Sequence, residues 1–488
     1  MKALKFLHAA DLHLDSPFKG MNSVPERIRD VIRESTFGAL SRLVRLAVRE
    51  KVDFAVFSGD IYDAGDRSLR AQLRFRSALA ELDRAGIPAL VIHGNHDPLD
   101  GRGADLEWPA GAYVYPADKV ETVRIVKEDR GLIAEVHGIS YAAAAVTENL
   151  ALRFRGGDAS VFQVALLHTN VDGHPGYDNY APCSKSDLVG RGIDYWALGH
   201  IHTREIVMDE KPVAVYPGNI QGRSIRECGP RGCYIVAVDE NGSPALDFHA
   251  LDGVRWQQES LSIAGIGTEQ ELQESLQDLL ARLREKAEGR PTVARIFLEG
   301  RGPLHLKLQA GSTLSDLLRE LRESELLALA GRSAAGYGRS GMGSGGFGTG
   351  SGHTEAPHPA DGNKEEGTMG SYPTAAPSGG VFRSAAVDIP FVWIESIEAR
   401  TGQDIDFELL LREESFIGDL LRLVEELAAD EGKLREFAEE ALGSLLAQNG
   451  ASRLFGGADG LLEDTGDWLE AARELAVDQL MPDGRRAK

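Results

Sequence analysis

The first half of the chain alternates short apolar runs with longer amphipathic stretches. Residues 26–50 and 67–86 repeat their apolar positions at helical spacing, which predicts two helices. The runs around them are short enough to be strands, and strand–helix–strand order predicts an α/β core with buried strands. Asp, Asn or His stands at the end of each run, and the runs are ALKFLHAA, DFAVFSGD, PALVIHGNHD, FQVALLHTN and DYWALGHIH.

The pattern changes after Trp256. Residues 257–265 and 292–300 have the composition of strands, and residues 268–289 between them predict an amphipathic helix closed by Gly289. This order predicts a small β-α-β unit, which we assign to a separate capping domain.

The later segments differ again in composition. Residues 331–380 hold 15 glycines among Ser, Thr, Pro and Ala, which is typical of a flexible linker. Beyond 381, a strand-like segment precedes amphipathic helices, which either pack on their own domain or dock a partner. We therefore expect a main domain over 1–252, the capping domain over 253–330, the linker over 331–380, and a strand plus helical C-terminal region over 381–488.

The chain has 488 residues and a formal net charge of −22, which at first argues against a nucleic-acid surface. The charge is unevenly placed, however. Residues 1–250 hold 29 basic and 34 acidic residues, a net charge of −5, whereas residues 251–488 hold 24 and 41, a net charge of −17. The total is therefore weak evidence about the substrate, and we expect the isolated chain to bind DNA weakly.

Cysteine content and hydropathy bear on the compartment. Three cysteines, none in a CxxC pair, make no disulfide framework and favour a reducing interior. The apolar run at the N-terminus is too short for a signal peptide, and no stretch approaches the ~20 apolar residues of a membrane helix. We expect a cytoplasmic protein without membrane association.

Five polar elements follow the apolar runs, and all contain residues that can bind a metal ion. A single Asp-x-His is weak evidence, but an ordered set with each member after its own strand is hard to obtain by chance. The carboxyl ends of strands are also where α/β folds place their sites. The elements are Asp11-Leu12-His13, Gly59-Asp60, Gly94-Asn95-His96-Asp97, His168 and Gly199-His200-Ile201-His202.

These residue types indicate two metal ions rather than one closed structural site, which would need four ligands and usually cysteine. In an extended chain Asp11 and His13 point to the same side and can chelate one ion, and His200 and His202 have the same spacing. Asp60 is the best candidate for a carboxylate that bridges the two ions.

The mixed ligands also bear on the metal and the reaction. Asn95 offers a neutral oxygen, which suits a site that an anionic phosphate must approach. Ligation by His, Asp and Asn favours Mn²⁺, Fe or Zn²⁺, whereas Mg²⁺ more often takes oxygen ligands alone. Two ions ~3.5–4 Å apart can hold a hydroxide between them and bind both sides of an in-line phosphoryl displacement.

These motifs resemble the calcineurin-like metallophosphoesterase superfamily over roughly residues 4–240. The flanking sequence resembles the DNA-repair exonuclease branch related to SbcD, specifically the YhaO-like group. The resemblance implies an α/β fold of two stacked mixed sheets flanked by helices, with the metals at strand ends on one edge. It is carried by HAADLHLDSPF, FSGDIYDAGDRS, VIHGNHDP, LLHTN, YAPCSKSDL, WALGHIH and YPGNIQGRSIRECGPRG.

The resemblance also implies a role for each motif residue. One ion would be held by Asp11, His13, Asp60 and His202, and the other by Asp60, Asn95, His168 and His200. His96 would steady the transition state and protonate the leaving oxygen, because imidazole titrates near neutral pH. Asp63 stands where some double-strand-break nucleases carry a histidine, so it would orient its neighbours, and Asp97 would cap or support the ligand loop.

Other polar residues in the first half receive plainer interpretations. We interpret His8, His93, His137 and His249 as packed core residues. Arg223 could contact phosphate together with Arg226, although exposed basic residues are more often solvated surface.

By resemblance, the chain is a Mn²⁺-dependent nuclease that cuts DNA phosphodiesters, as a 3′-to-5′ exonuclease with endonuclease capacity. Such nucleases form homodimers and work in DNA repair with an SMC-like ATPase, whose coiled coil would bind residues 414–446. Two alternatives stay open: hydrolysis of small phosphodiesters or nucleotides, and a largely scaffolding role in an ATPase complex. The appended domain and helices argue against the first, and the intact set of metal-binding residues argues against the second.

Overall fold

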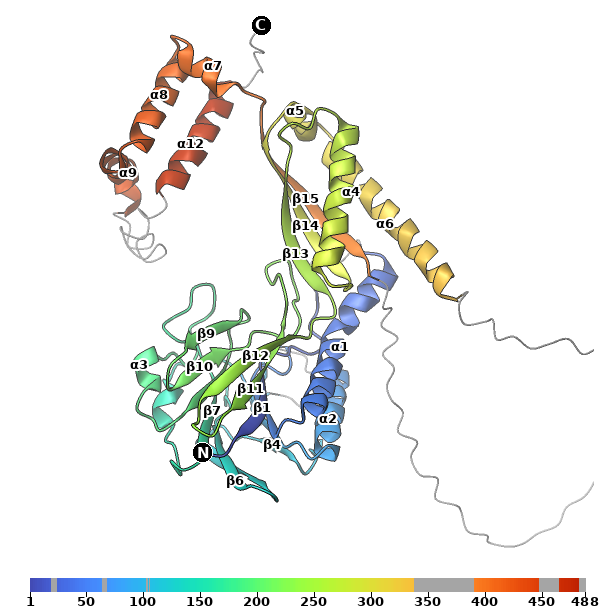
Figure 1. The fold of residues 1–488 in the computed structure, drawn as a ribbon, viewed down its shortest axis with the longest axis vertical. Coiled ribbons are helices and arrows are strands. Elements are labelled where there is room, and N and C mark those ends of the chain that lie inside the picture. The colour runs from blue at the N-terminus through green and yellow to red at the C-terminus, as the bar shows by residue number, and fades with distance from the viewer. Residues whose placement is uncertain are drawn as a thin grey trace, which may run out of the picture.

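The computed structural model describes residues 1–18, 24–63, 68–101, 104, 106–337, 390–446 and 465–481. Its N-terminal part stacks two six-stranded mixed sheets (Figure 1), which confirms the expected α/β fold with two stacked mixed sheets flanked by helices. The first sheet runs in the order β12 (Pro244–Ala250), β11 (Gly232–Val238), β1 (Leu4–Ala9), β2 (Phe54–Ser58), β3 (Ala89–Ile92) and β4 (Ala112–Val114). The second runs in the order β5 (Glu121–Lys127), β6 (Gly131–Gly138), β7 (Phe162–His168), β8 (Tyr195–Gly199), β10 (Val213–Tyr216) and β9 (Glu205–Met208).

Apolar side chains from both sheets fill the space between them. The Phe6 ring of β1 stacks on Phe54 of β2 with centroids 5.0 Å apart, and it meets Tyr195 of the second sheet edge-on at 5.2 Å. All three side chains are fully buried. Because the central strands are buried on both faces, their sequences are continuous apolar runs rather than alternating ones.

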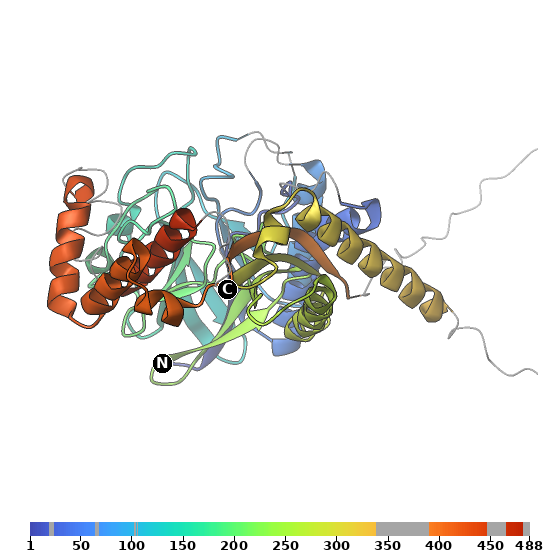
Figure 2. The same ribbon diagram turned by 90° about the horizontal axis from the view of Figure 1, so that it is seen from above.

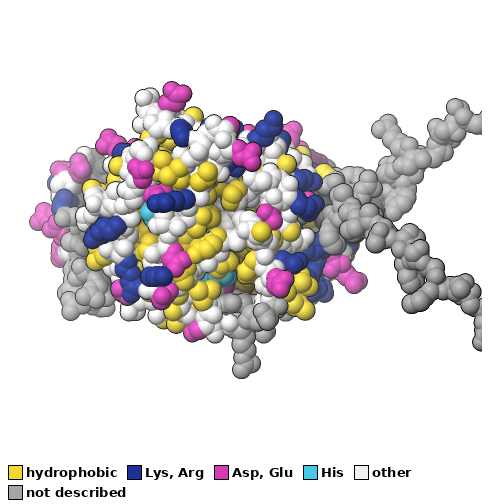
Figure 3. All heavy atoms as spheres, turned by 90° about the horizontal axis from the view of Figure 1, so that it is seen from below, with side chains coloured by type: hydrophobic (Ala, Val, Ile, Leu, Met, Phe, Trp, Pro, Cys, Tyr) yellow, Lys and Arg dark blue, Asp and Glu magenta, His cyan; other side chains and the backbone are white. Residues whose placement is uncertain are grey.

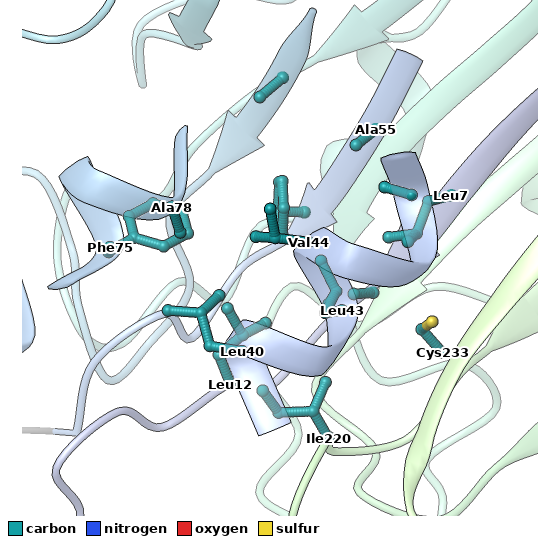
Figure 4. Packing of buried hydrophobic residues seen from close by; sticks show 14 of the residues in the cluster. Leu7, Leu12, Leu40, Leu43, Val44, Ala55, Phe75, Ala78, Ile220 and Cys233 are labelled. Atoms are coloured by element: carbon teal, nitrogen blue, oxygen red, sulfur yellow. The ribbon is translucent and has the colours of Figure 1, made fainter. Parts of the chain in front are cut away.

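Helices cover the outer faces of the two sheets. Leu43 and Val44 from the first long helix lie over the strands that carry Leu7 and Ala55 (Figure 4), and the four side chains belong to one buried cluster. The first sheet is covered by α1 (Glu26–Glu50) and α2 (Leu69–Arg84), and the second by η1 (Leu150–Arg153) and α3 (Lys185–Leu188).

The second domain is a parallel sheet in the order β13 (Arg255–Ser262), β14 (Thr292–Arg301), β15 (Val392–Gly402). The expected β-α-β unit is present, with α4 (Glu269–Lys286) between the first two strands. The third strand comes from the segment that we assigned to the C-terminal region, and α6 (Thr313–Tyr337), which follows α5 (His305–Gln309), continues beyond residue 330. The expected linker over 331–380 lies outside the described residues from 338 onward.

The C-terminal helices pack beside the second domain. Arg301 at the end of β14 forms ion pairs with Glu474 and Asp478, so it ties the last helix to the sheet. Seen from above, these helices lie on the side opposite to α6 (Figure 2). They are α7 (Phe407–Arg412), α8 (Phe416–Ala428), α9 (Glu431–Leu446) and α12 (Thr465–Leu480).

The surface of the described residues is mixed in character. On the face shown in Figure 3, basic and acidic side chains are interspersed among hydrophobic ones rather than gathered by sign. In the part of the chain that the structure describes, we find no helix with the length and hydrophobicity needed to span a bilayer.

Candidate metal centre

The residues expected to bind metal meet at one edge of the stacked sheets. Strands β1, β2 and β3 are adjacent and parallel in the first sheet, as are β7 and β8 in the second, so their carboxyl ends lie together. Among the described residues, the structure forms three groups in which the ligand atoms all lie within 4.8 Å of one another, and two of them share Asp11. The first is Asp11, His13 and His202, the second is Asp11, Asp60 and His168, and the third is His13, Asp63 and His96.

The first group is built by a tight loop after β1. Nε2 of His13 lies 3.1 Å from Nε2 of His202, so the two nitrogens face the same point. Asp11 and His13 have φ angles of 51° and 42°. The expectation of an extended chain at this position is therefore wrong, because the backbone N–H groups of Asp11 and His13 turn to the carbonyls of Gly59 and Asp60 instead.

The second group surrounds Asp60. Its Oδ2 lies 3.5 Å from Nε2 of His168 and 3.8 Å from Nε2 of His13. The amide oxygen of Asn95 lies 2.9 Å from Nε2 of His168 and 3.2 Å from Nδ1 of His200. Asp60 thus stands between the two sets of ring nitrogens, where a bridging carboxylate would have to be.

Gly94 makes this close approach possible. A Cβ at this position would lie 2.3 Å from Oδ1 of Asp60 and 2.7 Å from Nε2 of His168. Both distances are shorter than any non-bonded contact allows, so the ligand loop requires glycine here.

Hydrogen bonds to the backbone orient two of the rings. Nδ1 of His168 lies 2.9 Å from the carbonyl of Ser58, and Nε2 of His200 lies 2.8 Å from the carbonyl of Asp178. A carbonyl only accepts, so these nitrogens carry protons, and the opposite nitrogen of each ring faces the site, where it can bind a metal ion once it is deprotonated. This arrangement is typical of histidines that bind metal.

Known proteins share parts of this sequence. The model of the family "Calcineurin-like phosphoesterase" matches residues 4–204, and that of "Metallophosphoesterase YhaO, middle domain" matches residues 256–331. The uncharacterized metallophosphoesterase YhaO of Bacillus subtilis is 40% identical over 322 residues, which cover 66% of this chain and 78% of that protein. This chain belongs to the calcineurin-like phosphoesterase family. The expected resemblance to the YhaO-like group is confirmed.

Two further relatives of this phosphoesterase are more distant. The DNA double-strand break repair protein Mre11 of Saccharolobus solfataricus is 28% identical over 228 residues, covering 44% of this chain and 54% of that protein. The SbcD component of the nuclease SbcCD of Bacillus subtilis is 25% identical over 261 residues, covering 46% of this chain and 64% of that protein.

His96 lies at the rim of the phosphoesterase site. Its Nδ1 is 2.8 Å from Oδ1 of Asp63, and its side chain is 34% exposed, whereas that of His13 is fully buried. Asp63 also lies 3.5 Å from Nδ1 of His13 and accepts a hydrogen bond from the Ser16 hydroxyl at 2.6 Å. Burial lowers the pKa of His96, but the hydrogen bond to Asp63 and the charge of Asp60 outweigh it and raise that pKa.

Glu227 is a site residue that sequence reasoning missed. Its Oε1 accepts a hydrogen bond from Nδ1 of His202 at 2.7 Å, which leaves Nε2 of that ring for the metal. Burial raises the pKa of Glu227, but the His202 hydrogen bond and the nearby Arg223 charge outweigh it and lower that pKa. Glu227 stands in the segment SIRECGPRG, outside every metal motif, so only the folded chain reveals the contact.

Asp97 joins two of the loops that carry ligands from the first sheet, those after β2 and β3. Its carboxylate is fully buried and accepts hydrogen bonds from the backbone N–H groups of Gly94 and Ile61, each at 2.8 Å. Nδ1 of His93 donates to the same carboxylate at 2.9 Å. We interpreted His93 as a core residue, and it is buried, but it also supports the ligand loop through Asp97.

Opposite charges lie side by side within the buried cluster. Burial lowers the pKa of His168, but the neighbouring Asp60 carboxylate outweighs it and raises that pKa to about 9. Burial raises the pKa of Asp11 to about 6. A protonated His168 therefore pairs with Asp60, and a divalent cation that binds the same atoms would displace this proton. Buried oxygen and nitrogen donors of this kind fit divalent metal ions.

Proposed function

We propose that this phosphoesterase hydrolyses the phosphodiester bonds of DNA with the help of two divalent metal ions. The observation that carries the proposal is that two groups of candidate ligands share Asp11, with Asp60 between their histidines. The names of the distant relatives, a double-strand break repair protein and part of a nuclease, support DNA as the substrate. We propose 3′-to-5′ exonuclease and endonuclease activity, as expected from the sequence.

The metal ions would be held by side chains already gathered at the site. When bound, they would supply an activated water and neutralise phosphate charge, and Mn²⁺ suits the mixed donors. The ligands would be Asp11, His13, Asp60, Asn95, His168, His200 and His202.

His96 would act as the proton donor in this reaction. Its side chain is 34% exposed, so substrate can reach its ring, and the nearby carboxylates of Asp63 and Asp60 raise its pKa above that of an ordinary histidine. Because Nδ1 faces Asp63 at 2.8 Å, Nε2 is the nitrogen that would give its proton to the leaving 3′ oxygen. Asp63 would orient the ring and balance its charge.

The test is hydrolysis by the full chain in Mn²⁺, with linear duplex DNA, single-stranded DNA and bis(p-nitrophenyl) phosphate as substrates. We expect cleavage of DNA and of the small diester, and loss of both in Asp60→Asn. Asp247→Asn is a matched control, because Asp247 is an exposed carboxylate on β12 whose side chain pairs only locally with His249. Cleavage of the small diester alone would favour a metabolic phosphodiesterase, and cleavage of none would favour a scaffolding role.

The C-terminal helices stay the proposed docking site for an ATPase partner. α8 buries Leu421 and Leu427 but leaves Phe416 70% and Leu423 47% exposed, so part of its apolar surface is available. Within this proposal, Phe416→Ser and Leu423→Ser would weaken binding to a co-expressed SMC-like ATPase without changing hydrolysis of the small diester. Homodimerisation would be checked by sedimentation of the isolated chain.

A further inference from the structure

The loop between β10 and β11, residues 222–229, contacts the second domain on one side. Nε1 of Trp256 on β13 donates to the carbonyl of Gly222 at 2.8 Å, and the N–H of Gly229 donates to the carbonyl of Trp256 at 2.9 Å. The side-chain amide of Gln258 donates to a further carbonyl of the loop at 2.7 Å. Trp256 is only 2% exposed, so it is a fixed part of this contact. We call residues 222–229 the bridging loop.

On its other side, the bridging loop places the Arg223 guanidinium at the metal centre. Nη1 lies 3.3 Å from the Ser16 hydroxyl and 3.7 Å from Oδ2 of Asp63. Nη2 lies 3.3 Å from Nδ1 of His202 and 3.5 Å from Oε1 of Glu227. The guanidinium thus lies between Glu227, which orients the proposed ligand His202, and the carboxylate of Asp63 beside His96.

These contacts do not satisfy all the hydrogen-bond donors of the Arg223 guanidinium. A closed pair between arginine and a carboxylate has N–O distances of about 2.7–2.9 Å, shorter than any of those four contacts. Nε of Arg223 is buried and has no hydrogen-bond partner among the described residues. The side chain is 17% exposed, so part of it can be reached from solvent. A planar guanidinium with spare donors suits a phosphate oxygen.

The position of Arg223 relative to His96 decides which phosphate Arg223 would bind. His96 and Arg223 approach the same carboxylate, that of Asp63, at 2.8 Å and 3.7 Å. A phosphate whose leaving oxygen meets His96 therefore has a non-bridging oxygen within reach of Arg223.

We propose that Arg223 binds a non-bridging oxygen of the scissile phosphate, and that the second domain holds it there through Trp256 and the bridging loop. This inference rests on the proposed function, hydrolysis of phosphoesters at this site. It changes our interpretation of Arg223, which by sequence alone is more readily assigned to solvated surface.

The experiment compares Arg223→Gln and Arg223→Lys with Arg49→Gln, an exposed arginine at the end of α1. With bis(p-nitrophenyl) phosphate and saturating Mn²⁺, we expect kcat to fall by roughly 10²–10³-fold in Arg223→Gln, as for other donors to developing oxyanion charge. The lysine variant should recover part of the loss, and Arg49→Gln should match the wild type. Equal Mn²⁺ content in all variants would separate substrate contact from damage to the metal centre.

Binding of inorganic phosphate to the Mn²⁺-loaded protein, measured by calorimetry, tests the same contact without turnover. We expect at least ~10-fold weaker binding in Arg223→Gln, about the value of one charge-assisted hydrogen bond. If the wild type hydrolyses no phosphoester, the proposed function is wrong, and this binding still decides the role of Arg223. If Arg223→Gln hydrolyses the diester and binds phosphate as the wild type does, the role of Arg223 is wrong.

Trp256→Phe tests the contribution of the second domain. It keeps an aromatic ring but removes the N–H that binds Gly222, so we expect kcat/KM to fall by roughly threefold to tenfold. The effect should vanish when Arg223 is already Gln, because both changes act through one contact. Full additivity of the two substitutions would overturn the coupling.

Discussion

Replacing Asp97 with asparagine should test how the ligand loops are held. Oδ1 of Asp97 accepts the N–H of Gly94, whereas Oδ2 accepts those of Ile61 and the His93 ring, all between 2.8 and 2.9 Å. Asparagine has nearly the same shape but only one oxygen. In either orientation of its amide, an NH₂ group faces at least one buried N–H that has lost its acceptor.

The expected loss in the free energy of unfolding follows from these contacts. A hydrogen bond to a charged group contributes about 1.5–3 kcal/mol, and a buried donor left without an acceptor costs about 1–3 kcal/mol. We take about 3 kcal/mol as the expected loss in the free energy of unfolding for Asp97→Asn. In a domain of about 150–250 residues, 1 kcal/mol lowers the Tm by roughly 2–4 °C, so the expected decrease is roughly 6–12 °C.

Scanning calorimetry of metal-free protein would measure the transition of the phosphoesterase domain. Asp100→Asn is the matched control, because Asp100 is exposed three residues further along the same loop. Its Tm should stay within about 2 °C of the wild type, as for most surface substitutions. A similarly small shift in Asp97→Asn would refute the argument that this carboxylate holds the two loops together.

Three further predictions concern the metal centre and its surroundings. Glu227→Gln should weaken Mn²⁺ binding by about 10–100-fold in equilibrium dialysis, because the partner that orients His202 loses its charge; unchanged affinity would contradict this role. Gly94→Ala should lower the bound Mn²⁺ per chain, measured by elemental analysis, since its Cβ would lie 2.3 Å from an oxygen of Asp60. Burial lowers the pKa of His8 to about 3. As the pH falls below about 6.5, the His8 ring of the unfolded chain therefore binds a proton, whereas the ring in the folded protein stays neutral. Stability of metal-free protein should therefore fall from pH 6.5 towards 3, by on the order of 4 kcal/mol from this residue, and the Tm of His8→Gln should depend less on pH over that range.

The sequence predicted the parts of the fold and site that depend on local patterns. Apolar runs placed the central strands because those strands are buried on both faces. Polar residues at their ends placed the candidate ligands, because parallel strands bring their carboxyl ends to one edge. Asp60 and His168 come together for this reason, although they stand on different sheets.

The remaining features depend on contacts between distant segments. Nothing near Glu227 marks it as the partner of His202, and the backbone carbonyl that orients His200 carries no side-chain signal at all. The backbone of Asp11 departs from the expected extended form because its N–H bonds to the neighbouring loop. Strand composition identified a strand-like segment beyond residue 381, where β15 lies, but it could not say which neighbour that strand would pair with.

That pairing has a consequence for the order in which the chain can fold. β14 has β13 on one side, but its other neighbour, β15, is synthesised only after the segment that follows α6. A nascent chain that ends before Val392 therefore presents β14 with an unpaired backbone edge, which is prone to associate with other strands. The second domain can be completed only late in translation. A shortened protein made to remove the C-terminal helices should accordingly end after Gly402 rather than after α6.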